Sequence, residues 1–225
     1  MSLANVRKMD YFSDIMTLTQ QIRHRVMEMP VGTLFSVKEF LPMGSRAAID
    51  QALSRMVRAG TIARVTRGVF VRPKENRFLG KLAPEPASVA RLVATTSGGV
   101  FGLHGAEAAR QLGLTTQVPT QAVFYTSGPG HRFRMGELQV VLKHVSPRRL
   151  ALAGRPAGTA LSALWYLGKR QVTPAVVTAV RTRLGPEEFA ALEAATGAMP
   201  GWLTAVLRQQ HEDARVARYV YETLR

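Results

Sequence analysis

Apolar residues in the first third of the chain recur at helical spacing in three stretches, and the pattern then changes to strand-like alternation. The first stretch predicts a helix that begins near Ser13 or Asp14 and ends at Pro30. In the second stretch, Ser36 and Glu39 form a capping box, which predicts a short helix. Two helices are therefore expected before the third and most regular stretch begins.

The third stretch has the clearest division between an apolar and a polar face. It predicts a helix from Arg46 to about Ala59, with Ser45 as its N-cap and Gly60 as its stop. The apolar stripe consists of Ile49, Ala52, Leu53, Met56 and Val57. The opposite face carries Arg46, Asp50, Gln51, Ser54, Arg55 and Arg58. Such a helix buries one side and leaves a polar, largely cationic side in water.

A basic hairpin is predicted directly after this helix. Residues 61–65 and 69–72 alternate β-branched with basic residues, and Gly68 occupies the turn, where glycine adopts a positive φ at little cost. A short helix, a longer helix and a hairpin follow one another in this order in a winged helix-turn-helix. We therefore expect residues 10–73 to form a winged helix-turn-helix DNA-binding domain.

The remainder of the chain predicts a second domain. Residues 74–86 are rich in proline and glycine and are expected to form a linker. Residues 87–225 predict mostly helices, with strands near 121–126, 132–135 and 138–145 joined by short turns. The expected fold class is α+β: an N-terminal winged helix-turn-helix followed by a mainly helical domain with a small antiparallel sheet.

The charge of the chain makes a polyanion the expected partner. The 225 residues include 30 Lys/Arg and 15 Asp/Glu, a formal net charge of +15. Residues 1–80 alone hold 13 Lys/Arg against 6 Asp/Glu. A folded protein this basic is expected to meet nucleic acid or an acidic membrane surface, and the order of the predicted elements favours double-stranded DNA. The alternative is an arginine-rich surface that serves solubility alone.

The composition also predicts a cytosolic protein without a membrane partner. The chain has no cysteine, which removes disulfides, thiolate metal sites and a cysteine nucleophile, and fits a reducing compartment. The longest apolar run, Ala157–Leu167, is shorter than the roughly 18–20 residues that span a bilayer. The N-terminal residues contain no apolar signal core.

The polar face of the third helix supplies the candidate base-reading residues. In a helix-turn-helix, the second helix enters the major groove, where Arg and Gln side chains can hydrogen-bond base edges in pairs. The residues expected to read bases are Arg46, Gln51, Ser54 and Arg55. Asp50 lies on the same face and would repel phosphate, although a carboxylate can accept a hydrogen bond from cytosine.

A second set of residues is expected to contact phosphates. Ser45 and the backbone N–H groups that follow it begin the helix, where an anion is stabilised. The other members lie later in the helix and on the hairpin, and the full set is Ser45, Arg58, Arg64, Arg67 and Arg72. The alternative is that this domain serves protein contacts only and that its arginines are ordinary solvated side chains.

Enzyme chemistry finds little support in the sequence. The chain contains no G-x-x-x-x-G-K-[ST] loop, and the glycine-rich stretch Ser97–Gly105 matches no phosphate-binding fingerprint. The five histidines are scattered without paired ligand spacing. We therefore predict no catalytic residues, no cofactor and no metal. An enzyme acting on nucleic acid is kept only as a third hypothesis.

Three strings in the sequence resemble a known family. The first runs from Phe35 to Pro73 and reads F-S-V-K-E-F-L-P-M-G-S-R-A-A-I-D-Q-A-L-S-R-M-V-R-A-G-T-I-A-R-V-T-R-G-V-F-V-R-P. It resembles the N-terminal winged helix of AbiEi-type antitoxins of type IV toxin–antitoxin (abortive-infection) systems. The strings H-G-A-E-A-A-R-Q-L-G-L-T-T-Q-V-P-T-Q-A-V-F-Y-T-S-G and P-R-R-L-A-L-A-G-R-P-A-G resemble related bacterial proteins grouped with these antitoxins as a domain of unknown function.

The resemblance covers about residues 10–205 and implies a repressor with two domains. Its N-terminal domain would bind inverted repeats in its own promoter, with Ser45–Arg58 as the reading helix and Thr61–Arg72 as the wing. Its C-terminal domain would counter a nucleotidyltransferase-like toxin encoded beside it. Two copies, as a dimer or side by side, are needed to cover inverted half-sites about one helical turn apart. The alternative is an interaction protein that binds a toxin or another partner, with DNA binding incidental.

Overall fold

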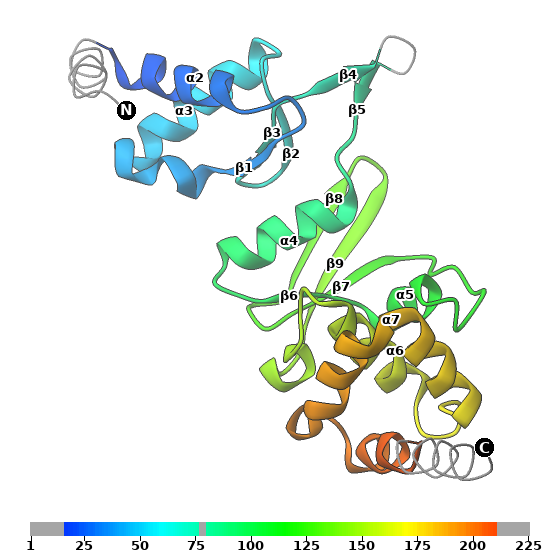
Figure 1. Cartoon of the computed structure of the whole chain (residues 1–225). Coiled ribbons are helices and arrows are strands. Elements are labelled where there is room, and N and C mark those ends of the chain that lie inside the picture. Colours follow the sequence, from blue (N-terminus) through cyan, green and yellow to red (C-terminus); the bar gives the residue numbers. More distant parts are fainter. Residues whose placement is uncertain (1–15, 77–79, 211–225) are drawn as a thin grey trace, which may run out of the picture. The chain divides into compact units, whose positions relative to one another are not determined.

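The computed structural model describes residues 16–76 and 80–210, and these divide into two compact units. The first unit contains the described residues up to Thr96 together with Arg134–Gly136, and the second contains Ser97–Phe133 and the described chain from Glu137. The fold is of the α+β class, as expected (Figure 1). The expected helix start at Ser13 or Asp14 lies outside the described residues.

The first unit begins with a helix, a strand and two further helical segments. These elements are α2 (Leu18–Glu28), β1 (Leu34–Ser36), the 3-10 helix η1 (Val37–Met43) and α3 (Arg46–Arg58). Thr17 caps α2, and the predicted capping box at the start of η1 is present, with the Ser36 N–H donating to Glu39 Oε1 at 2.6 Å. The predicted helix from Arg46 to about Ala59 is confirmed to within a residue as α3.

The first unit also contains a small three-stranded sheet. Strands β2 (Ala63–Thr66) and β3 (Val69–Val71) form the expected hairpin, and β1 pairs with the other side of β3, giving the strand order β1-β3-β2. Both pairings are antiparallel. The register shifts between Arg64 and Thr66, which marks a bulge just before the turn.

The core of this unit lies between the helices and the sheet. Phe35 of β1 is fully buried, and its ring lies 5.7 Å from that of Phe40 and 5.8 Å from that of Phe70. The four most buried residues of α3 are Ile49, Ala52, Leu53 and Met56, and they join the same cluster. Because these are residues of the predicted apolar stripe, α3 must turn its cationic side outward.

The prediction of a linker over residues 74–86 is wrong. Strands β4 (Lys74–Asn76) and β5 (Gly80–Leu82) pair antiparallel there, and α4 (Pro86–Thr96) begins at the end of the segment. Helix α4 packs on β1 and β3 and buries Val89, Ala90 and Ala94. The boundary between the two units therefore falls after Thr96, because α4 covers the sheet of the first unit.

The second unit combines a four-stranded sheet with helices. Its elements are β6 (Phe101–Leu103), α5 (Gly105–Gln111), β7 (Ala122–Thr126), β8 (His131–Met135), β9 (Leu138–His144), the 3-10 helices η2 (Pro147–Leu150) and η3 (Thr196–Ala198), α6 (Pro156–Leu167) and α7 (Pro174–Ala194). Gly105 allows α5 to approach α6 closely, because a Cβ at that position would overlap the Tyr166 side chain. Helix α7 is kinked at Gly185, which has a φ of 71°.

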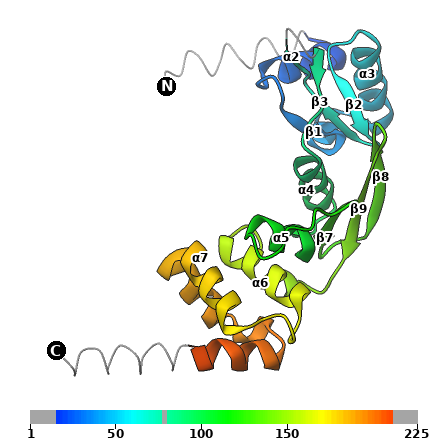
Figure 2. The same ribbon diagram turned by 90° about the vertical axis from the view of Figure 1, so that its right-hand side faces the viewer.

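The sheet of the second unit is mixed, so the prediction of an antiparallel sheet is wrong. The strand order is β6-β7-β9-β8, and β7 pairs with β9 in parallel. Figure 2 shows β8 at the outer edge of this sheet, beside β9. Strand β9 takes the inner place because Val140 and Leu142 are buried, whereas β8 exposes His131, Arg132 and Arg134. Charged side chains are typical of an edge strand.

No helix among the described residues has the length and apolar content that crossing a membrane requires.

Candidate nucleic-acid interface

Helix α3 presents the predicted base-reading residues on one exposed face. At 3.6 residues per turn, Arg46, Asp50, Ser54 and Arg58 descend one side of this face, and Gln51 and Arg55 descend the other. Arg46, Gln51 and Arg55 are exposed, and Ser54, in the first row, is half-buried. The four predicted base-reading residues therefore share the polar half of α3, with Arg46 and Arg55 at its two edges. We call this surface, with Arg58, the α3 face.

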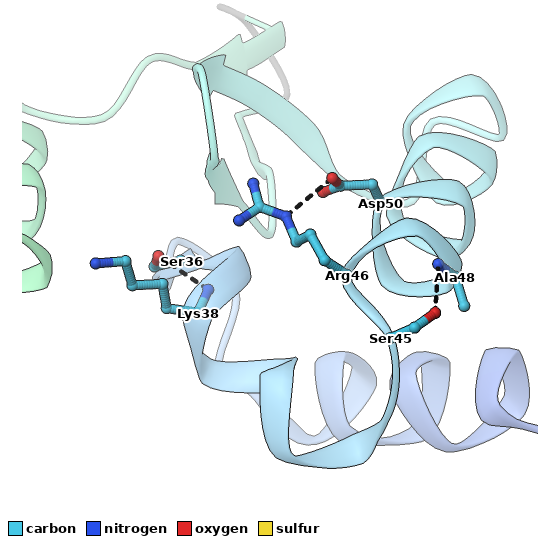
Figure 3. Close-up of polar contacts among 6 residues, drawn as sticks. All are labelled: Ser36, Lys38, Ser45, Arg46, Ala48 and Asp50. Carbon is cyan, nitrogen blue, oxygen red and sulfur yellow. Dashed lines mark hydrogen bonds and ion pairs between the residues drawn. The ribbon is translucent and has the colours of Figure 1, made fainter.

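Asp50 holds Arg46 in place on the α3 face. The Arg46 Nε donates to Asp50 Oδ2 at 2.9 Å, across one turn of the helix (Figure 3). The two terminal nitrogens of the guanidinium point away from Asp50 in this view. A guanidinium fixed through Nε keeps its outer edge free for a two-bond contact, such as that with guanine O6 and N7. Asp50, which the sequence suggested would repel phosphate, is thus paired with Arg46.

The N-terminus of α3 is capped by Ser45. Its Oγ accepts a hydrogen bond from the Ala48 N–H at 3.3 Å, and Ser45 itself is exposed (Figure 3). The preceding residue, Gly44, is also exposed. The partial positive charge of a helix N-terminus stabilises a phosphate at such a place.

The turn of the hairpin is anchored beside the start of η1. The Val37 N–H donates to the Gly68 carbonyl at 3.0 Å, and Gly68 has a φ of 74°. Arg67, in the same turn, is exposed, as is Arg64 in β2. The Arg64 guanidinium lies 5.4 Å from the centre of the Phe70 ring, so its stem packs on the core while its charge stays in water.

Arg72 is directed toward the protein rather than toward solvent. It is half-buried, and its Nη1 donates to the carbonyl of Met27 at 2.7 Å and also to that of Met29. These carbonyls end α2, where the helix leaves acceptors without partners. The prediction of a phosphate contact at Arg72 is therefore corrected: its contacts are structural.

Replacing Arg72 with alanine should lower the free energy of unfolding by about 1–3 kcal/mol, because the hydrogen bonds from a charged donor are lost. Denaturant titration of the full chain measures this loss. The salt dependence of DNA binding by the folded variant should stay at the wild-type value. A reduced salt slope of DNA binding, with an unchanged free energy of unfolding, would instead show that Arg72 contacts phosphate.

Sequence reasoning missed a second group of cations, which lies in the second unit. His104, His131, Arg132 and Lys143 line one groove, although up to 39 residues separate them in the sequence. The alternation of basic residues in β8 was the one sequence feature that pointed to this group. It did not predict that Lys143 of β9 and His104, the N-cap of α5, lie beside them.

Comparison with known proteins places the chain in a family. A crystal structure of the RV2827C protein from Mycobacterium tuberculosis is similar at 15% sequence identity and a TM-score of 0.37, over 84% of this chain and 75% of that chain. No curated protein matches the chain. A family model with the description "Family of unknown function (DUF6088)" matches residues 21–191, which reach from α2 into α7. The chain therefore belongs to the DUF6088 family.

Proposed function

We propose that this protein is a sequence-specific DNA-binding repressor whose first unit acts as a winged helix-turn-helix. In this proposal, η1 and α3 are the two helices of the motif, and the β2–β3 hairpin is the wing. The order of the elements and the strand order β1-β3-β2 support this reading. Helix α3 would enter the major groove, which admits a single α-helix.

The observation that carries the proposal is the composition of the α3 face. Arg46, Gln51 and Arg55 are exposed on the polar half of a helix whose other side buries Ile49, Ala52, Leu53 and Met56. Two guanidiniums and one carboxamide are the side chains that pair most often with guanine and adenine edges. Their single acidic neighbour, Asp50, is already paired with Arg46.

The biological role follows from the family resemblance of the sequence. We propose that the protein represses its own operon as an antitoxin of the AbiEi type, and that its second unit counters a nucleotidyltransferase-like toxin. The strings H-G-A-E-A-A-R-Q-L-G-L and P-R-R-L-A-L-A-G-R-P-A-G, on which the second part rests, begin at α5 and at η2. The alternative role is a protein-interaction module with incidental DNA binding.

The DNA proposal is tested by fluorescence anisotropy with a labelled duplex from immediately upstream of the coding sequence. The protein should bind this duplex about 1000-fold or more tightly than a shuffled duplex of equal length and composition. Equal affinity for the two duplexes would reject a sequence-specific repressor. Co-purification of the full chain with the product of the adjacent gene tests the antitoxin role separately, and repeated absence of a complex would reject it.

Arg58 and Arg67 should act on affinity without acting on sequence preference. Replacing either with alanine should reduce the slope of log K against log salt by about 0.9, because one phosphate contact is lost on B-DNA. The ratio between the upstream and shuffled duplexes should remain unchanged, since phosphate contacts carry no sequence information. Arg170→Ala, an exposed residue between α6 and α7, is the control and should leave the slope as it is.

A further inference from the structure

The second unit contains a groove on one face of its mixed sheet. Val123 of β7 and Val141 of β9 are register partners, so their side chains lie next to each other on the same face. Both are half-buried and line a cavity of about 830 Å³. The neighbouring residue Val140 points to the opposite face and is buried in the unit. The two valines therefore form an apolar floor that the described residues leave partly open.

Basic side chains lie around this apolar floor. His131 and Arg132 from β8 and Lys143 from β9 are exposed and line the groove, and His104 lines it as a half-buried residue. The described lining contains no carboxylate. An uncompensated group of this kind favours an anionic ligand.

His104 contributes a hydrogen-bond donor to this group. Its Nδ1 accepts from the Ala106 N–H at 3.2 Å, so the proton of the neutral imidazole lies on Nε2. Burial lowers the pKa of His104, and the charges of Lys143 and Arg149 lower it further. Both effects favour the neutral imidazole, burial more than the neighbouring charges.

Arg149 adds a fixed positive charge near His104. Its guanidinium lies 5.0 Å from the centre of the Tyr125 ring and 4.9 Å from that of Trp165, and Nη2 lies 3.3 Å from the Tyr125 hydroxyl. The His104 ring in turn lies 4.9 Å from the Tyr125 ring. Two aromatic faces hold this cation in one orientation without neutralising it, so its field persists.

We propose that the groove binds a nucleotide, with its phosphate against Lys143 and Arg132 and its base over the two valines. An apolar floor beside clustered cations matches a ligand that is flat and apolar at one end and anionic at the other. Gln121 and Gln139, which also line the groove, supply amide donors and acceptors for the base. A single-stranded nucleic acid fits less well, because the described lining has no Phe, Tyr or Trp on which successive bases stack.

Isothermal titration of the full chain tests this site with ATP, GTP, AMP, adenosine, inorganic phosphate and a single-stranded oligouridine as separate probes. At least one mononucleotide should bind, and adenosine should bind about tenfold or more weakly than AMP or ATP, because charged hydrogen bonds to phosphate are lost. The double variant Arg132→Ala/Lys143→Ala should weaken nucleotide binding by about tenfold or more for the same reason. Both side chains are exposed, so the variant should keep the wild-type thermal midpoint.

Lys169→Ala/Arg170→Ala is the matched control, because it removes the same two charges from exposed positions of the same unit. It should leave nucleotide binding within about twofold of wild type. NMR titration adds an independent readout: bound phosphate should raise the pKa of His104, since it offsets the charge of Lys143.

Three results would overturn the nucleotide site: binding of none of the mononucleotides, equal weakening in the double variant and the control, or tight binding of the oligouridine alone. The last result would assign the groove to a strand of nucleic acid instead. The proposal is independent of DNA recognition, because substitutions on the α3 face should leave nucleotide binding unchanged.

Discussion

Replacing Arg46, Gln51 and Arg55 together with alanine should abolish preferential binding to the upstream duplex. Each two-bond contact with a base contributes about 1–3 kcal/mol of discrimination, so losing three should weaken specific binding by about 100-fold or more. The folded state should remain intact because all three side chains are exposed. Fluorescence anisotropy at one fixed salt concentration measures the loss, and circular dichroism checks the fold.

A matched control separates base reading from loss of charge. Arg170, Arg208 and Gln209 are exposed residues of the second unit, and their combined replacement removes the same two arginines and one glutamine. This control should keep the preference for the upstream duplex over the shuffled one. If the α3 variant instead binds with unchanged affinity and salt slope, the assignment of α3 as the reading helix is wrong.

Phe35→Ala should be the most damaging single substitution in the first unit. The ring is fully buried, and its centre lies 5.7 Å from that of Phe40 and 5.8 Å from that of Phe70, its register partner in β3. Truncating a buried phenylalanine costs about 3–5 kcal/mol, since the transfer free energy is lost and a cavity remains. A protein of ordinary stability has only about 5–15 kcal/mol to lose. DNA binding should therefore disappear with the fold at physiological temperature.

Chemical denaturation of the full chain, followed by far-UV circular dichroism, measures this loss as a shift of the first transition. Val31→Ala is the comparison, because Val31 is 57% exposed and its truncation should cost less than about 0.5 kcal/mol. A loss below about 1 kcal/mol for Phe35→Ala would show that β1 does not hold the helices and the hairpin in one core.

The first unit was largely predictable because its signals are local. Ser45 and Gly60 bracket α3 in the sequence, and the apolar stripe between them is the stripe that the core buries. The capping box of Ser36 and Glu39 likewise lies within one turn. The pairing of β1 with β3 required the folded chain, because Phe35 and its register partner Phe70 are 35 positions apart and no short turn joins the two strands.

The errors arose where distant segments meet. Strand β7 pairs with β9 and not with β8, which follows it directly in the sequence. Burial of Val140 and Leu142 places β9 inside the sheet and leaves β8 at its edge. Arg72 looked like another basic residue of the hairpin, yet its partners are the carbonyls of Met27 and Met29. The alternation of β-branched and basic residues identifies a strand. It cannot show which of its arginines lies beside the unpaired carbonyls of a helix C-terminus in the folded chain.

The most direct measurement uses the absence of cysteine from the chain. A Ser54→Cys variant carries its only thiol at the centre of the α3 face, and a Ser88→Cys variant carries it on an exposed position of α4. Each is labelled with a photoactivatable cross-linker and irradiated with the upstream duplex. The account predicts cross-linking to the duplex from position 54, suppressed by unlabelled upstream DNA but not by shuffled DNA. Cross-linking from position 88 without cross-linking from position 54 would contradict it.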